Sequence, residues 1–103
     1  MICLTVLYPK TADSQFDADY YFDKHLPLVR ERLTSMGLTG IDAEQGLAGA
    51  APDSPPSYAV IARLNFGSGE ELQNALAVHG PELIGDIPNF TDVEPLMQIS
   101  QIH

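Results

Sequence analysis

The chain has 103 residues, 45% of them hydrophobic, and a formal net charge of −9 from 14 acidic and 5 basic side chains. This excess of acidic groups repels phosphate backbones and anionic lipids, so neither nucleic acid nor a membrane is expected as a partner. The length predicts one domain, residues 1–103, and the lack of a long apolar run or a secretory leader predicts a cytoplasmic protein. The single cysteine, Cys3, cannot form an internal disulfide and is interpreted as a small buried residue.

The N-terminal third of the chain predicts a strand followed by a helix. Residues 2–8 are rich in β-branched and apolar side chains, and Pro9 ends the run. From Asp17, which suits the N-cap position, apolar side chains recur three or four positions apart as far as Met36. This spacing predicts an amphipathic helix that ends at Gly37.

The rest of the chain predicts two strands, a second helix and a last strand. Residues 41–47 have a weak strand pattern and residues 58–66 a clear one, with an exposed loop rich in glycine and proline between them. A capping box at Ser68–Glu71 opens the second helix, and Gly80-Pro81 is expected to end it. Residues 93–102 predict the last strand.

The element order βαββαβ predicts an α+β, ferredoxin-like fold, in which two helices cover one face of a four-stranded antiparallel sheet. Pro95 predicts an edge position for the last strand or a bulge at its start. The other face of the sheet mixes apolar and polar side chains, among them Thr5, Leu7, Ile61 and Arg63. Because a patch of this kind is rarely left exposed, we expect a homodimer in which two sheets meet face to face.

The first predicted helix carries a candidate functional residue, His25. On a helical wheel His25 lies to one side of the core direction, and Tyr21 lies one turn earlier on the same flank. This places both side chains at the border between core and solvent, where a pocket between helix and sheet would open. Pro27 has no N–H group, so we expect a bend or break of the helix near His25.

Two interpretations of His25 follow from these residues. In the functional one it gives or accepts a proton near neutral pH, with Tyr8 at the end of the first strand as the better pocket companion. Asp23 lies too far around the helix to pair with it. In the structural one its ring packs against Tyr21, and its nitrogens bond backbone groups that Pro27 has freed.

The other histidines are weaker candidates. His79 is expected to end the second helix, where a positive charge interacts favourably with the helix dipole, and it is also retained as a substrate-binding candidate. His103 is terminal. The histidines have no HxH or HExxH spacing, so no metal site is expected. No glycine-rich loop leads from a strand into a helix, so no bound nicotinamide or flavin cofactor is expected either.

Four segments taken together resemble the EthD family, and the likeness runs nearly end to end. They are TVLYP (5–9), FDADYYFDKHLPLV (16–29), GLAG (46–49) and DIPNFTDVEPLMQIS (86–100). The resemblance implies the dimeric α+β barrel superfamily and places the family's functional histidine on His25, beside Tyr21 and Pro27. Phe90 stands where a tyrosine is common in the family, so a phenol at that position is dispensable.

The resemblance also implies a class of function. EthD-like proteins are named for an association with ether degradation and are often labelled reductases or oxidoreductases, and proteins of the same barrel fold include cofactor-independent monooxygenases, polyketide cyclases and dehydratases. We therefore expect an oxidoreductase-type enzyme for a small, largely apolar organic molecule, without a tightly bound cofactor. His25 is the catalytic candidate. The candidates for substrate contact are Tyr8, Tyr21, His79 and Phe90. The alternatives are a non-catalytic binding or accessory module and a polyketide cyclase- or dehydratase-like enzyme.

Overall fold

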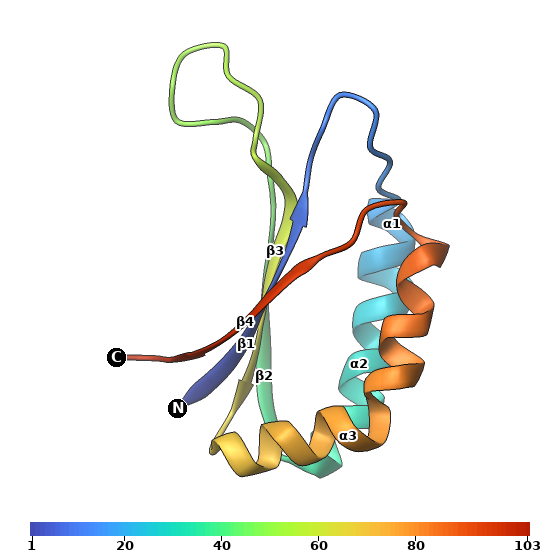
Figure 1. The fold of residues 1–103 in the computed structure, drawn as a ribbon, viewed down its shortest axis with the longest axis vertical. Coiled ribbons are helices and arrows are strands. Elements are labelled where there is room, and N and C mark those ends of the chain that lie inside the picture. The colour runs from blue at the N-terminus through green and yellow to red at the C-terminus, as the bar shows by residue number, and fades with distance from the viewer.

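The computed structural model describes residues 1–103 and consists of one sheet with its helices on one side (Figure 1). The strands are β1 (Ile2–Pro9), β2 (Leu38–Gln45), β3 (Tyr58–Phe66) and β4 (Leu96–Gln101). The α-helices are α1 (Ala18–Tyr20), α2 (Leu26–Leu33) and α3 (Gly69–Asp86). The strand order is β2-β3-β1-β4, and all neighbours are antiparallel. The predicted α+β ferredoxin-like fold is therefore confirmed.

The two faces of the sheet differ as the alternation of the sequence predicts. Leu4, Val6 and Tyr8 of β1 lie opposite Leu64, Ala62 and Val60 of β3, and all six are buried beneath the helices. The opposite face of these central strands has no helix over it, and Figure 1 shows this side bare. We call it the open face; its members on β1, β3 and β4 include Thr5, Leu7, Ile61, Arg63, Leu96 and Gln98. None of the helices is long and apolar enough to cross a membrane.

The first helical stretch begins as predicted and contains one wide turn. The Asp17 side chain caps it by accepting a hydrogen bond from the Tyr20 amide at 3.1 Å. Between α1 and α2, residues Tyr21–His25 form a π-helical turn, in which the Leu26 amide donates to the Tyr21 carbonyl. Pro27 is the second residue of α2, so the wider turn lies directly before a residue that cannot donate to the carbonyl behind it. The expected break near His25 is thus present.

The second helix is longer than predicted. Ser68 caps it as expected, accepting from the Glu71 amide at 3.2 Å, but α3 continues through Gly80-Pro81 as far as Asp86. The helix changes direction about midway instead of ending (Figure 1), because a proline inside a helix removes one hydrogen bond and crowds the preceding turn. The second half of α3 then runs beside α2.

Two strands also differ from their predicted bounds. β2 begins at Leu38, not at residue 41, because Gly37 takes a left-handed conformation (φ 104°) that reverses the chain directly into the strand. It ends at Gln45, and Leu47 is exposed in the following loop. β4 begins at Leu96, after Pro95, and lies at the sheet edge as the proline predicts.

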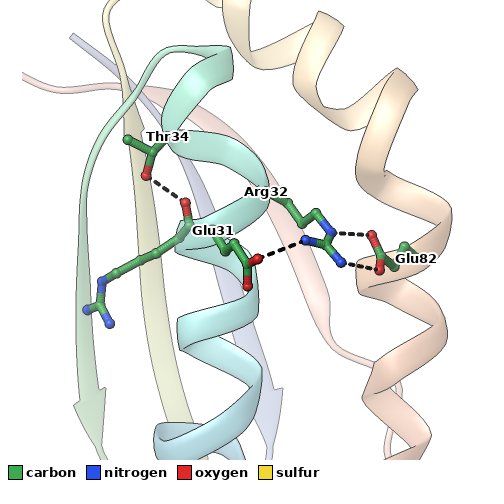
Figure 2. A network of polar contacts seen from close by, with 5 residues as sticks. Glu31, Arg32, Thr34 and Glu82 are labelled. Atoms are coloured by element: carbon green, nitrogen blue, oxygen red, sulfur yellow. Dashed lines mark hydrogen bonds and ion pairs between the residues drawn. The ribbon is translucent and has the colours of Figure 1, made fainter.

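An ion pair joins α2 to the second half of α3 (Figure 2). The Arg32 guanidinium donates to both carboxylate oxygens of Glu82, at 2.9 Å from Nε and 3.3 Å from Nη2, and also lies 3.3 Å from a Glu31 oxygen. Hydrogen bonding to Glu82 raises the pKa of Arg32, and the guanidinium in turn lowers the pKa of Glu82. Because Glu82 lies one turn before Asp86, this forked contact helps to fix the end of α3 against α2.

Replacing Arg32 by lysine is expected to lower the thermal midpoint slightly, because an ammonium group cannot make the two-pronged contact with Glu82. Both side chains reach solvent, so the difference between variant and wild type should shrink in high salt. Thermal melts at low and high ionic strength measure it. An equal difference at both salt concentrations would show that the pair does not act through charge.

Candidate functional site

The functional candidate His25 is paired with a carboxylate on the other helix. Its Nδ1 atom lies 2.9 Å from Oδ2 of Asp86, at the end of α3. The other carboxylate oxygen, Oδ1, accepts hydrogen bonds from the Tyr20 hydroxyl at 2.7 Å and from the Asn89 amide at 2.9 Å. Asp86 is therefore held by three donors from two segments of the chain, and it is well placed to orient the imidazole.

These contacts decide the charge of Asp86. Burial alone would raise its pKa, but the hydrogen bonds from Asn89, His25 and Tyr20 together bring the pKa below the usual aspartate range. The hydrogen bond from Tyr20 to Asp86 also raises the pKa of the Tyr20 phenol. An ionised carboxylate has no proton to give, so the bond to His25 requires a hydrogen on Nδ1. In the neutral imidazole the second nitrogen, Nε2, is then the bare acceptor.

Aromatic rings surround the imidazole. The Tyr21 ring stacks on it, with centroids 5.5 Å apart and planes inclined by 24°, and the Phe90 ring lies 4.7 Å away. Tyr8 in turn meets Tyr21 edge to face at 5.5 Å. Only 5% of His25, 1% of Tyr21 and 2% of Tyr8 is exposed. The imidazole and these rings are therefore largely shielded from solvent.

A cavity of about 60 Å³ lies beside these rings, between the helices and the sheet. Of its 16 lining residues 14 are hydrophobic, and Tyr8, Tyr21 and His25 are among the 16. The volume is enough for several water molecules or a small chemical group. Ile84 of α3 and Met97 of β4 are lining residues that are also largely exposed, so the cavity opens between these two elements.

Three polar atoms of the residues that line this cavity have no partner in the protein. They are His25 Nε2 and the hydroxyl oxygens of Tyr8 and Tyr21, which make no hydrogen bond. Burial raises the pKa of both phenols, and the neighbouring Tyr21 raises that of Tyr8 further, so both hydroxyls keep their protons. The site thus offers one proton acceptor and two neutral hydroxyl donors to a molecule in an apolar enclosure.

The structure brings together four of the five residues that the sequence singled out: Tyr8, Tyr21 and His25 line the cavity, and the Phe90 ring packs against all three. Phe90 lies behind the imidazole and not on the cavity wall. His79 is half-buried in the middle of α3, away from the lining, and does not end the helix as expected.

The position of His25 also differs from the prediction. It and Tyr21 are buried and do not lie at the border between core and solvent, because the π-helical turn adds a residue that a regular wheel does not allow for. The structural interpretation is correct in one part, the packing of His25 on Tyr21. The partner of Nδ1, however, is a carboxylate and not a freed backbone group.

Two members of the site escaped the sequence reasoning. Asp86 lies beyond Gly80-Pro81, where the second helix was expected to end, and Tyr20 was not among the candidate site residues. The one signal for Asp86 was its place at the start of the DIPNF stretch that contributes to the family resemblance. No group of three or more histidine, cysteine or acidic side chains is close enough to hold a metal ion.

The depressed pKa of Asp86 predicts a pH dependence of stability. A carboxyl whose pKa is lower in the folded than in the unfolded state stabilises the fold above the unfolded pKa, near pH 4, and loses this contribution as the pH falls through the folded value. In urea titrations between pH 5 and pH 3, wild type should therefore lose its advantage over Asp86→Asn. Parallel curves for the two proteins would contradict this role.

Comparisons with known proteins support this fold and add a family. An EthD-like protein from Ralstonia eutropha JMP134, known from a crystal structure, is 39% identical with a TM-score of 0.91, and the match covers 97% of this chain and 89% of that one. An ethyl tert-butyl ether D (EthD) family protein from Bacillus halodurans C-125 is 21% identical with a TM-score of 0.78, over 100% of this chain and 99% of that one.

A third crystal structure is similar in fold alone. It is an antibiotic biosynthesis monooxygenase that is 14% identical with a TM-score of 0.52, over 100% of this chain and 99% of that one. No protein-family model matches the chain, and no curated protein is similar enough to count as a relative. The identity and coverage of the Ralstonia structure are decisive, and we conclude that the chain belongs to the EthD family.

Proposed function

We propose that the chain is an oxidoreductase-type enzyme that acts on a small, largely apolar organic molecule, with His25 as its general acid or base. The observation that carries the proposal is the pairing of His25 Nδ1 with Asp86, which leaves Nε2 unpartnered beside an apolar cavity. Carboxylate–histidine pairs of this kind orient the imidazole and stabilise its protonated form during proton transfer. The neutral hydroxyls of Tyr8 and Tyr21 would hold the substrate's oxygen.

An oxidation fits the same geometry. Removal of a proton from the substrate leaves an electron-rich anion, which is easier to oxidise than the protonated form, and dioxygen would be the oxidant. At the level of fold alone, the likeness to an antibiotic biosynthesis monooxygenase supports this direction. The chain's own residues would contribute proton transfer, orientation and the exclusion of water.

We also propose that the protein is a homodimer joined through the open face. The centre of that face is apolar: Leu7 of β1 lies between Ile61 of β3 and Leu96 of β4, and Leu96 is 55% exposed in the single chain. Two copies that meet here would remove this stripe from water. Sedimentation equilibrium at micromolar concentration should give the mass of two chains, and a single-chain mass would refute the dimer.

The test of the enzymatic proposal compares wild type with His25→Phe, which keeps an aromatic ring against Tyr21 but has neither nitrogen. A panel of small apolar alcohols, phenols and ketones is screened by thermal shift, since a ligand of the folded state raises its midpoint. Compounds that stabilise wild type are then incubated in air and followed by mass spectrometry. Conversion by wild type and none by His25→Phe is the expected result, and equal conversion by both would overturn the role of His25.

If compounds of the panel bind to wild type but are not converted, the result favours the second candidate, a binding module that leaves its ligand unchanged. The apolar lining of the cavity is compatible with that function too. A panel in which nothing binds would refute both candidates, because each requires the cavity to be occupied.

A further inference from the structure

The imidazole that Asp86 holds is also part of the cavity lining. Nδ1 faces the carboxylate at 2.9 Å, and both carboxylate oxygens are occupied by donors, so the carboxylate cannot move to another partner without losing bonds to Tyr20 and Asn89. The side chains of His25 and Asp86 are only 7% and 14% exposed. In so enclosed a place, the tautomer of His25 is set by Asp86 and not by exchange with solvent.

The protein has no hydrogen-bond partner for the second imidazole nitrogen, Nε2, to match the one that Asp86 provides for Nδ1. Nε2 of a neutral His25 accepts from a hydrogen-bond donor, and the hydroxyls of the other two polar lining residues, Tyr8 and Tyr21, donate to an acceptor, but no hydrogen bond within the protein occupies any of these atoms. A hydroxyl group on a ligand matches both kinds of atom, since its hydrogen can be donated to Nε2 and its oxygen lone pairs can accept from the phenols. A ketone or an ether lacks the hydrogen, and a hydrocarbon lacks both.

Resting on the function proposed above, we propose that Asp86 is a positioning residue that fixes His25 Nε2 as a proton acceptor, and that the cavity takes an apolar molecule with one weakly acidic hydroxyl, a phenol or an enol. The remaining lining is apolar and suits a hydrocarbon body. The two tyrosine hydroxyls suit an oxygen on which negative charge develops.

The step that this arrangement performs is a proton transfer. The O–H bond of the ligand breaks, its electron pair stays on oxygen, and the proton forms a new N–H bond at Nε2. The products are a phenolate or enolate, held by the Tyr8 and Tyr21 hydroxyls, and an imidazolium held by the Asp86 carboxylate. Net charge is conserved, and no further reactant is needed for this step.

The size of the cavity defines how such a ligand enters. A cavity of about 150 Å³ accepts benzene in another protein, so the cavity of about 60 Å³ found here must widen to hold an aromatic ring. The opening is lined by Ile84 and Met97, which are 55% and 44% exposed, and methionine is the most adaptable of the apolar side chains. We therefore expect the ring to enter between α3 and β4.

The first experiment needs no ligand. Nitrogen-15 NMR of the histidine rings, recorded at a pH at least about two units above the usual histidine pKa of about 6.5 so that the imidazole is neutral, distinguishes a protonated from a bare ring nitrogen. For His25 we expect Nδ1 protonated and Nε2 bare in wild type, and a mixture of tautomers in Asp86→Asn. Asp23→Asn is the matched control, since it makes the same change on an exposed side chain two residues from His25. A hydrogen on Nε2 in wild type would overturn the proposal, whatever the enzyme's activity.

The second experiment compares phenol with toluene, which has nearly the same shape and no hydroxyl. Calorimetry should show phenol binding to wild type and to Asp23→Asn, with a weakening of about tenfold or more in Asp86→Asn, as for the loss of one charge-assisted hydrogen bond. Toluene should bind wild type more weakly than phenol does, and its affinity should be the same for wild type and Asp86→Asn. Equal binding of phenol and toluene by wild type would overturn the ligand class.

These results can be separated from those of the enzymatic proposal. A bare Nε2 and a preference for phenol without any conversion would leave the positioning role of Asp86 intact and refute the oxidoreductase function. Conversion of substrates that carry no hydroxyl would support the oxidoreductase function and refute the proposed ligand class. If Asp86→Asn fails to fold, the tautomer in wild type and the phenol–toluene comparison still decide the proposal.

Discussion

Replacing Tyr21 by alanine is expected to reduce the free energy of unfolding by about 3–5 kcal/mol, as for other buried aromatic residues. The ring is only 1% exposed and belongs to a cluster of aromatic side chains. Its ring neighbours are Tyr8, Phe16, Phe22, His25 and Phe90. Because a domain of this size has a total stability of only about 5–15 kcal/mol, the variant should be close to unfolding. Urea denaturation followed by circular dichroism measures the change.

The matched control for this prediction is Tyr21→Phe. It keeps the ring and removes a hydroxyl that makes no hydrogen bond in the protein, so it should change stability by about 1 kcal/mol or less. The same variant should weaken phenol binding, because we propose that this hydroxyl holds the ligand's oxygen. A Tyr21→Ala protein as stable as wild type would mean that the cluster is not part of the core.

Replacing Leu7 by glutamate is expected to dissociate the proposed dimer. Leu7 is at the middle of the apolar stripe on the open face, between Ile61 and Leu96. In a single chain the new carboxylate stays in contact with water, but in a face-to-face dimer two of them would be buried close together without a partner. Association should weaken by at least about 100-fold, which equals roughly 2.8 kcal/mol. Sedimentation equilibrium over a range of protein concentrations measures it.

Val78→Glu is the control for the effect of an added charge. Val78 is 62% exposed on α3, which packs on the opposite face of the sheet, so this change should leave the mass of the particle unaltered. Circular dichroism of Leu7→Glu verifies that the chain is still folded. A dimer that survives the Leu7→Glu change would place the interface elsewhere.

The parts of the fold that local rules govern could be predicted from the sequence. The alternation of Leu4, Val6 and Tyr8 identified the buried face of β1, and the caps at Asp17 and Ser68 marked where the helices begin. These features depend on neighbours within a few residues, so the sequence pattern is sufficient to predict them. The π-helical turn was predicted only as a bend or break of the helix. Pro27 indicates that one backbone hydrogen bond is lost, but not which hydrogen-bond pattern the neighbouring residues adopt instead.

The course of α3 shows where local rules fail. Glycine followed by proline usually ends a helix, but here the helix goes on because its second half has tertiary contacts to make: Leu83 is buried in the core and Glu82 pairs with Arg32. These contacts offset the hydrogen bond lost at Pro81. For the same reason the pairing of His25 with Asp86 could not be predicted, since no periodicity connects residues that lie 61 positions apart.

The bent path of α3 has a consequence for the order of events in folding. The His25–Asp86 bond closes a loop of 61 residues, so a chain that has formed its first helix and even the pairing of β1 with β3 still lacks the proton acceptor. The acceptor appears only when the last quarter of the polypeptide docks. Conversely, transient opening of the segment after Gly80 would remove the proposed proton acceptor while the central strands stay paired, so the proposed activity would report on a local equilibrium rather than on global stability.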